Sequence, residues 1–79
     1  MTLSNHPRLL FGLNLRIART ALGLTQKDVA EKVGIHHSYV GAVERGERNV
    51  SVNNMHRLAE AVDREVFDLL RPIAQDQTD

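Results

Sequence analysis

The sequence contains no cysteine and no tryptophan, and its only aromatic residues of the Phe, Trp and Tyr type are two phenylalanines and one tyrosine. The absence of cysteine excludes a disulfide scaffold, a thiolate zinc finger and a thiol nucleophile. No apolar run exceeds the three residues 9–11, so we expect no membrane-spanning segment. A basic-then-apolar secretion leader is also missing. With 79 residues, 42% of them hydrophobic, the chain is expected to be a single globular domain over 1–79 in the cytoplasm.

An excess of either charge is lacking as well, because ten basic residues balance ten acidic ones. The balance conceals a gradient along the chain. Residues 1–48 carry seven Lys or Arg against four Asp or Glu, whereas residues 49–79 carry three against six. The first part is therefore basic and the last part acidic, and the distribution of charge is more informative than its sum.

Hydrophobic periodicity predicts helices throughout, since no stretch alternates apolar and polar residues as a strand would. We expect five helices. Three cover about residues 8–21, 26–33 and 36–45, and the fifth covers about residues 65–74. The fourth is capped by Ser51 and carries Met55, Leu58, Ala59 and Val62. Phe11, Leu15, Ala18 and Leu22 form the inner stripe of the first helix. Pro72 should kink or end the fifth helix, and residues 75–79 are expected to be frayed. The fold class is therefore all-α.

Residues 25–45 have the features of a helix-turn-helix. Thr25 is a suitable N-cap for the second helix, and Asp28 favours the positive end of the helix dipole. Gly34 suits the sharp turn that follows. Ala30 is small where two crossing helices approach closely. Apolar residues that can fill the space between the helices are Val29, Ile35, Val40 and Val43.

The segments LTQKDVA (24–30), VGI (33–35) and VERG (43–46) resemble the signature of the Cro/cI/XRE helix-turn-helix proteins. The resemblance covers about residues 9–70. The segments SYV (38–40) and ERGERNVS (44–51) are similar to the controller proteins of restriction–modification systems. This family resemblance implies a five-helix, lambda-repressor-like DNA-binding domain.

The resemblance also implies roles for matching positions. Residues implied to contact DNA bases, on the outward face of the third helix, are His37, Ser38, Gly41 and Ala42. Residues implied to contact the DNA backbone are Thr25, Gln26, His36, Tyr39, Arg45, Arg48 and Asn49. Arg19 and Glu44 match a pair that forms an internal salt bridge. His36 departs from the pattern because Ser or Thr is usual at this N-cap. Gly41 and Ala42 are too short for bidentate base contacts.

The fifth predicted helix is expected to carry a dimer interface within about residues 63–74. Val66 and Phe67 are adjacent and cannot both face one interior, so the patch of Val66, Phe67, Leu70 and Ile73 is better explained by a second copy of the chain. No metal or other cofactor is expected, since adjacent histidines on a helix diverge by roughly 100° and no cysteine or carboxylate cluster completes a ligand set.

We therefore expect a homodimeric, sequence-specific transcriptional regulator that is not an enzyme and that binds an inverted-repeat DNA operator. An autoregulatory controller of a restriction–modification system fits best, and RNA polymerase is a candidate partner. Two alternatives stay open. One is an antitoxin or phage-type repressor. The other is a protein-interaction module with the same fold and no affinity for DNA, which the zero net charge and short recognition side chains would favour.

Overall fold

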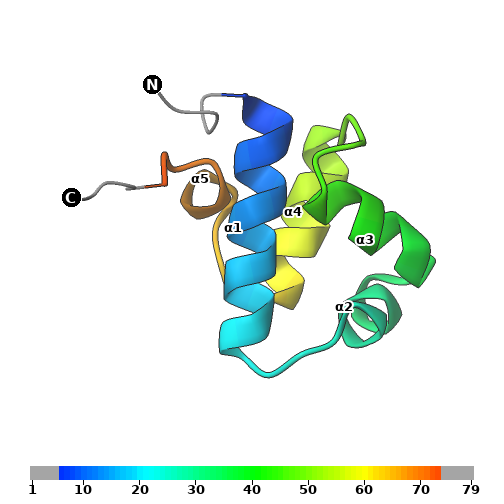
Figure 1. Cartoon of the computed structure of the whole chain (residues 1–79). Helices are drawn as coiled ribbons and strands as arrows, with labels where there is room; N and C mark the ends of the chain where they lie inside the picture. The colour runs from blue at the N-terminus through cyan, green and yellow to red at the C-terminus, as the bar shows by residue number, and fades with distance from the viewer. Residues whose placement is uncertain (1–5, 74–79) are drawn as a thin grey trace.

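The computed structural model describes residues 6–73, and these form five α-helices without strands (Figure 1). The helices are α1 (Pro7–Ala21), α2 (Gln26–Val33), α3 (His37–Glu44), α4 (Val52–Ala61) and α5 (Val66–Leu69). The predicted all-α class is confirmed. Residues 75–79, which we predicted to be frayed, lie outside the described part of the chain. No described helix is long and apolar enough to cross a membrane.

Local signals set where the helices begin. Pro7 stands at the first position of α1, where its missing N–H costs nothing. The Thr25 hydroxyl accepts a hydrogen bond from the Asp28 amide at 2.9 Å, and the Asp28 carboxylate accepts one from the Thr25 amide at 2.8 Å. This reciprocal capping box satisfies two amides at the start of α2. Ser51 caps α4 by accepting from the Asn54 amide at 3.1 Å.

The turn between α2 and α3 depends on a left-handed glycine. Gly34 has φ 84° and ψ 37°, a conformation that side-chain-bearing residues rarely adopt. Its amide donates to the Ala30 carbonyl at 2.8 Å, and the Ile35 amide donates to the same oxygen at 3.0 Å. On the far side, the Arg57 guanidinium of α4 donates to the Val33 carbonyl at the end of α2. The turn is thereby held from both the helix pair and α4.

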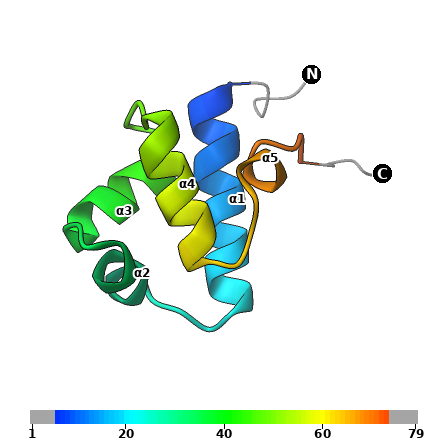
Figure 2. The same cartoon turned by 180° about the vertical axis from the view of Figure 1, so that it is seen from behind.

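The core lies where α1 and α4 meet the helix pair. α2 and α3 lie on one side of α1, and α5 lies on the other side, as the two opposite views agree (Figures 1 and 2). The largest fully buried side chains are Leu15, Val29, Val40, Val43, Leu58, Val62 and Leu69. Leu22 was expected in the core stripe, but it is 44% exposed. It is the C-cap residue of α1, where the chain leaves the helix, so the helical period no longer directs it inward.

α1 and α3 approach so closely that only glycine fits at one position between them. A Cβ atom on Gly12 would stand 2.3 Å from the Val43 carbonyl oxygen and 2.8 Å from that of Glu44. Both neighbours are backbone atoms, which cannot rotate away as a side chain can. The missing side chain at Gly12 therefore sets how near the end of α3 lies to α1.

The fifth helix is much shorter than predicted. We expected residues 65–74, whereas α5 ends at Leu69, and Ala74 lies outside the described residues. The residue before a proline avoids the helical conformation, so Arg71 cannot continue the helix into Pro72. The Asn14 side-chain amide of α1 also donates to the carbonyls of Leu69 and Arg71, each at 3.0 Å. These two bonds satisfy carbonyls that a longer helix would have used internally.

Candidate nucleic-acid interface

The N-terminal end of α3 is capped by a histidine. His36 Nδ1 accepts a hydrogen bond from the Ser38 amide at 3.1 Å, so the imidazole takes the place of the Ser or Thr that is usual there. The Ser38 hydroxyl lies 2.8 Å from the same nitrogen. The His36 ring stacks on His37, with ring centroids 4.7 Å apart and an interplanar angle of 24°. His37 and Ser38 are both exposed beside this cap. The cap thus orders the part of α3 expected to contact bases.

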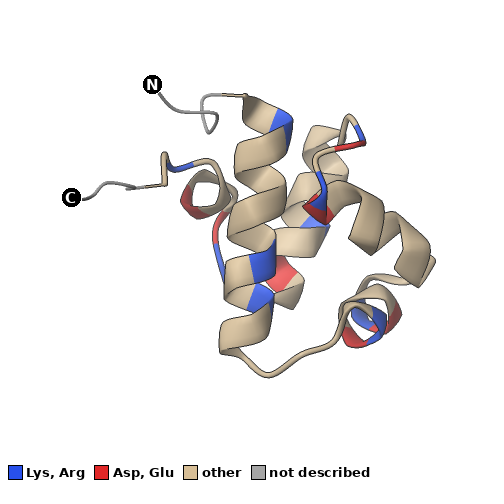
Figure 3. Cartoon of the chain, in the orientation of Figure 1, with Lys and Arg blue, Asp and Glu red and all other residues tan. Residues whose placement is uncertain are grey.

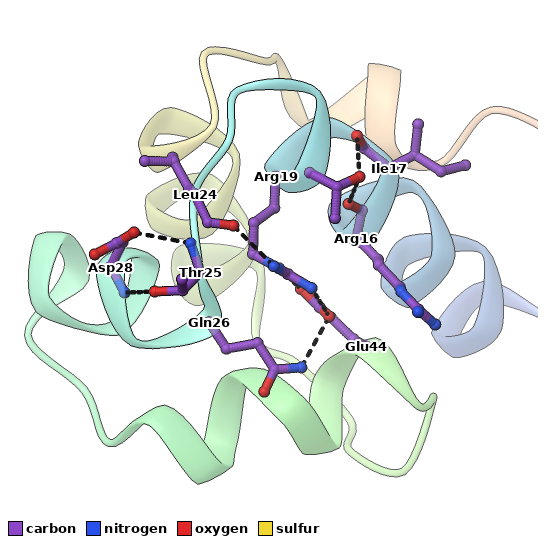
Figure 4. A network of polar contacts seen from close by, with 9 residues as sticks. Arg16, Ile17, Arg19, Leu24, Thr25, Gln26, Asp28 and Glu44 are labelled. Atoms are coloured by element: carbon purple, nitrogen blue, oxygen red, sulfur yellow. Dashed lines mark hydrogen bonds and ion pairs between the residues drawn. The ribbon is translucent and has the colours of Figure 1, made fainter.

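A buried ion pair connects α1 to the other end of α3. Arg19 Nε donates to Glu44 Oε2 at 2.6 Å, and its terminal nitrogen donates to Oε1 at 3.0 Å (Figure 4). The side chains are only 11% and 3% exposed. The Glu44 hydrogen bond raises the pKa of Arg19; burial opposes this shift and the Glu44 charge adds to it. Arg19 also donates to the Leu24 carbonyl at 2.8 Å. The structure therefore contains the salt bridge expected between Arg19 and Glu44.

Gln26 belongs to the same network. Its side-chain nitrogen donates to Glu44 Oε1 at 3.1 Å, as Figure 4 shows, so Gln26 reaches from the start of α2 to the end of α3. A Cβ on Gly41 would lie 3.2 Å from the Gln26 side-chain oxygen and 3.2 Å from an Arg45 guanidinium nitrogen. Gly41 is buried, and these two side chains lie over it. Gln26 and Arg45 thus cover Gly41, which we expected to be open to DNA as a base contact.

Cations lie at the end of α3 and in the loop after it, rather than along its length (Figure 3). Within α3 the only charged residue of the Asp, Glu, Lys and Arg type is Glu44. Arg45 forms two hydrogen bonds to Glu47, at 3.0 and 3.1 Å. The Glu47 hydrogen bond raises the pKa of Arg45, and the Arg45 hydrogen bond lowers that of Glu47. The Arg48 guanidinium lies 5.0 Å from the centre of the Tyr39 ring. Two exposed arginines therefore lie at the end of α3 and in the loop after it.

The sequence reasoning did not include Arg8 in this group. The Arg8 guanidinium is 3.5 Å from the Asn49 side-chain oxygen, so the start of α1 lies beside the loop after α3. Arg8, Arg48 and Asn49 line an apolar cavity of about 220 Å³ together with Phe11, Val50 and Met55, among others. Arg8 is one residue beyond Pro7 at the helix entry, and no short-range pattern links it to Asn49. Their proximity depends on the packing of α1 against the loop.

The residues expected to form a dimer interface do not all have the same exposure. Phe67 is 63% exposed, and the Arg71 guanidinium lies 6.0 Å from its ring centre. Val66 and Leu70 are partly buried against the core, and Ile73 is also partly buried. Two exposed apolar residues that the sequence reasoning missed lie on the neighbouring α1, namely Leu13 at 39% and Ile17 at 55%. Leu13 and Ile17 are four residues apart and do not belong to the buried stripe of α1, and this spacing could have indicated a second apolar face.

Metal binding has no geometric support within residues 6–73, where no three His, Asp or Glu side chains gather as a ligand set. His36 and His37 stack on each other at the start of α3. His56 instead lies on α4, with its Nε2 4.0 Å from a Glu60 carboxylate oxygen. These histidines therefore belong to two different elements and do not converge.

Comparisons with known proteins give consistent results. The family model HTH_3, described as helix-turn-helix, matches residues 15–69. The chain is 35% identical over 69 residues to the control protein C.BamHI of Bacillus amyloliquefaciens, covering 86% of this chain and 85% of the relative. It is 42% identical over 57 residues to the control protein C.SmaI of Serratia marcescens, covering 72% and 68%. The crystal structure of the restriction–modification controller protein C.AhdI from Aeromonas hydrophila matches with 50% identity and a TM-score of 0.74, covering 78% of this chain and 94% of that one.

Proposed function

The chain belongs to the HTH_3 family of helix-turn-helix proteins, and on this premise we propose that it is a sequence-specific DNA-binding regulator of transcription that controls a restriction–modification system. The observation that carries the proposal is the likeness to C.AhdI, which extends over nearly all of that protein. The similarity to two further control proteins supports the same role. We place the protein in the cytoplasm, where such a regulator meets its DNA.

We propose that α3 enters the major groove with its N-terminal end first. His37 and Ser38 are exposed at this end and are the proposed base contacts, with the half-buried Ala42 able to touch a thymine methyl group. Gly41 is not proposed as a contact, because Gln26 and Arg45 cover it. With so few long side chains facing the bases, a large share of the specificity should come from the shape and deformability of the DNA.

Phosphate contacts are proposed on both sides of α3. The start of α2, at Thr25 and Gln26, offers a helix N-terminus to one phosphate. At the other side the exposed cations of the loop, Arg45 and Arg48, can reach the DNA backbone. The remaining proposed backbone contacts are His36, Tyr39, Asn49 and, from its position beside Asn49, Arg8.

We propose that two copies bind one operator as a homodimer. A 63% exposed phenylalanine on a domain this small leaves an apolar surface that a second copy can cover. α1 packs against α5, so Leu13 and Ile17 can extend the surface that begins at Phe67. α5 lies across α1 from α2 and α3, so an interface that includes α5 leaves α3 free for DNA (Figure 2). A two-fold dimer implies an inverted repeat with half-sites roughly one helical turn apart.

Selection of bound sites from a random DNA pool tests the DNA-binding proposal. We expect recovery of a spaced inverted repeat. Arg48→Ala should weaken binding to all sites alike and reduce the salt slope by about one, as loss of one phosphate contact does. His37→Ala should change the preferred sequence instead. A pool that shows no enrichment would exclude sequence-specific binding and favour a protein-interaction module.

Sedimentation of the free protein tests the dimer separately. Phe67→Glu should shift the molecule toward the monomer, because it places a charge in the proposed apolar contact. Leu22→Glu is the matched control, since Leu22 is also exposed, at 44%, but lies at the end of α1. Equal effects of the two variants would contradict the proposed interface. Transcription in vitro from the selected operator, with RNA polymerase, then shows whether the bound protein represses or activates.

A further inference from the structure

We propose that Ser38 contacts the base edges only as a hydrogen-bond acceptor, because its own hydroxyl proton is donated to His36. The inference rests on the proposed function for the assignment of Ser38 as a base contact. It adds the chemical identity of the partner group on the DNA, namely an exocyclic amino group of cytosine or adenine.

The contact with the Ser38 amide determines which nitrogen of the His36 ring is protonated. The Ser38 amide lies 3.1 Å from His36 Nδ1 and can only donate. Nδ1 must therefore carry a free lone pair, and the ring must be the neutral form with its proton on Nε2. This tautomer suits the proposed backbone contact as well, since Nε2–H can donate to a phosphate oxygen.

The unprotonated Nδ1 in turn determines the orientation of the Ser38 hydroxyl. Ser38 Oγ lies 2.8 Å from Nδ1, a normal distance for a hydrogen bond from an O–H group. Because Nδ1 has no proton, the hydrogen between the two atoms must come from Ser38. The amide and the hydroxyl of Ser38 share one acceptor, and the stack on His37 supports the ring in this position. The Ser38 oxygen keeps only its lone pairs for other partners.

Base edges in the major groove present both donors and acceptors to a serine. Cytosine N4 and adenine N6 are amino donors there, whereas guanine O6 and N7 and thymine O4 are acceptors. A serine with a free hydroxyl can pair with either kind, so serine ordinarily discriminates poorly. With its proton committed to His36, the exposed Ser38 can pair only with the donors. His36 is thereby a positioning residue that sets the base preference of its neighbour.

Nitrogen-15 NMR of the His36 imidazole tests the hydrogen-bond polarity without DNA. We expect Nδ1 to give the signal of an unprotonated nitrogen and Nε2 that of an N–H. The opposite tautomer would overturn the inference. This measurement is independent of whether the protein binds DNA, so it separates the inference from the proposed function.

Site selection with variants tests the consequence for DNA. The position that Ser38 contacts is the one whose preference changes in Ser38→Ala. For the parent we expect cytosine or adenine there, and removing the amino group from that base should weaken binding roughly 2- to 12-fold, the usual worth of one hydrogen bond. Ser38→Ala should abolish this sensitivity. Selection of guanine or thymine acceptors, or an operator without any position sensitive to Ser38→Ala, would overturn the inference while leaving the proposed function in place.

Two substitutions of His36 complete the test. His36→Ala removes the acceptor and frees the hydroxyl, so the preference at the Ser38 position should broaden to include guanine and thymine. His36→Asp keeps both an N-cap and an acceptor for the Ser38 proton, and should retain the preference while weakening affinity through its charge. An equal preference in both variants would contradict the role of His36, whatever their stabilities.

Discussion

Removal of Arg19 should leave a buried negative charge that the domain cannot support. Arg19→Met keeps an unbranched apolar stem but removes the guanidinium, so Glu44 loses two hydrogen bonds and retains the donor from Gln26. The Glu44 side chain is 3% exposed, so water cannot replace the lost partner. Breaking a buried pair in this way costs about 3–5 kcal/mol. A chain of 79 residues has a stability of roughly 4–12 kcal/mol in total, so the loss takes a large share of it.

Urea and thermal unfolding followed by circular dichroism measure this loss. For a domain of this size, a change of 1 kcal/mol moves the midpoint by about 4–8 °C, so Arg19→Met should lower it by at least about 12 °C. The comparison needs a fixed protein concentration, because association of a dimer would add to the stability. A midpoint within about 8 °C of the parent would refute the reasoning, since it would mean that Glu44 is solvated or protonated at little cost.

The double variant Arg19→Met/Glu44→Leu is the matched control. It removes both charges and leaves apolar groups of similar size, and such replacements of buried pairs are often neutral or stabilising. We expect it to recover most of the stability lost by Arg19→Met. Gln26 loses its acceptor in the double variant, so DNA binding should stay impaired even where folding is restored. A double variant as unstable as Arg19→Met would show that the unpaired charge of Glu44 does not cause the loss.

The remaining predictions concern three local contacts. Gly12→Ala should destabilise the fold by about 1–3 kcal/mol, because the alanine Cβ would meet the Val43 carbonyl oxygen. In a helix without this close contact, the same substitution would stabilise by about 1 kcal/mol. A thermal unfolding midpoint at or above that of the parent would contradict the close approach of α1 and α3. Hydrogen bonds from the Thr25 amide and hydroxyl lower the pKa of Asp28, so its contribution to stability is present above the unfolded pKa of about 3.9 and is lost as the pH falls through the lower folded value. The free energy of unfolding of Asp28→Asn should accordingly fall less steeply below about pH 4 than that of the parent. Equal pH dependence of the two proteins in acid would exclude the capping role of Asp28. Asn14→Ala should lower the free energy of unfolding by about 1–3 kcal/mol, because two hydrogen bonds are lost. It should also speed hydrogen exchange of the amides in α5 more than in α2. An equal increase in both helices would contradict the role of Asn14 in holding α5.

The helix-turn-helix could be predicted almost to the residue because its signals are local. Thr25 and Asp28 are three residues apart, and Gly34 ends α2 by its own conformation. The predicted range for α2 agrees with Gln26–Val33, and the prediction for α3 was one residue too long at each end. The sequence pattern did not predict that the His36 side chain caps α3. The imidazole Nδ1 accepts the hydrogen bond from the Ser38 amide that a Ser or Thr hydroxyl usually accepts at this position.

Three other differences from the predictions share a different cause, which is contact between distant parts of the chain. The Asn14 side chain donates a hydrogen bond to the Leu69 carbonyl at the end of α5, although Asn14 lies 55 residues earlier in the chain. No local pattern around Leu69 predicts this hydrogen bond. Gly41 sits on the expected face of its helix, but Gln26 crosses from α2 and covers it. Arg8 reaches Asn49 across 41 residues. Periodicity indicates which face of a helix is polar, but it does not show which polar side chains will cover one another.

The zero net charge can now be related to individual side chains. Arg19 forms a buried ion pair with Glu44, so it contributes little to the electrostatic field outside the protein. Arg45 is exposed but already paired with Glu47, so a phosphate at Arg45 must replace a carboxylate that is bound through two hydrogen bonds. Arg48 lies over Tyr39 and stays exposed. Of these three arginines, only Arg48 has no carboxylate partner within residues 6–73. Because the net charge of the chain is also zero, the non-specific, salt-dependent attraction of a single copy to DNA should be weak. Under the proposed function, tight binding then requires two copies on one operator, which makes occupancy of that operator depend steeply on protein concentration.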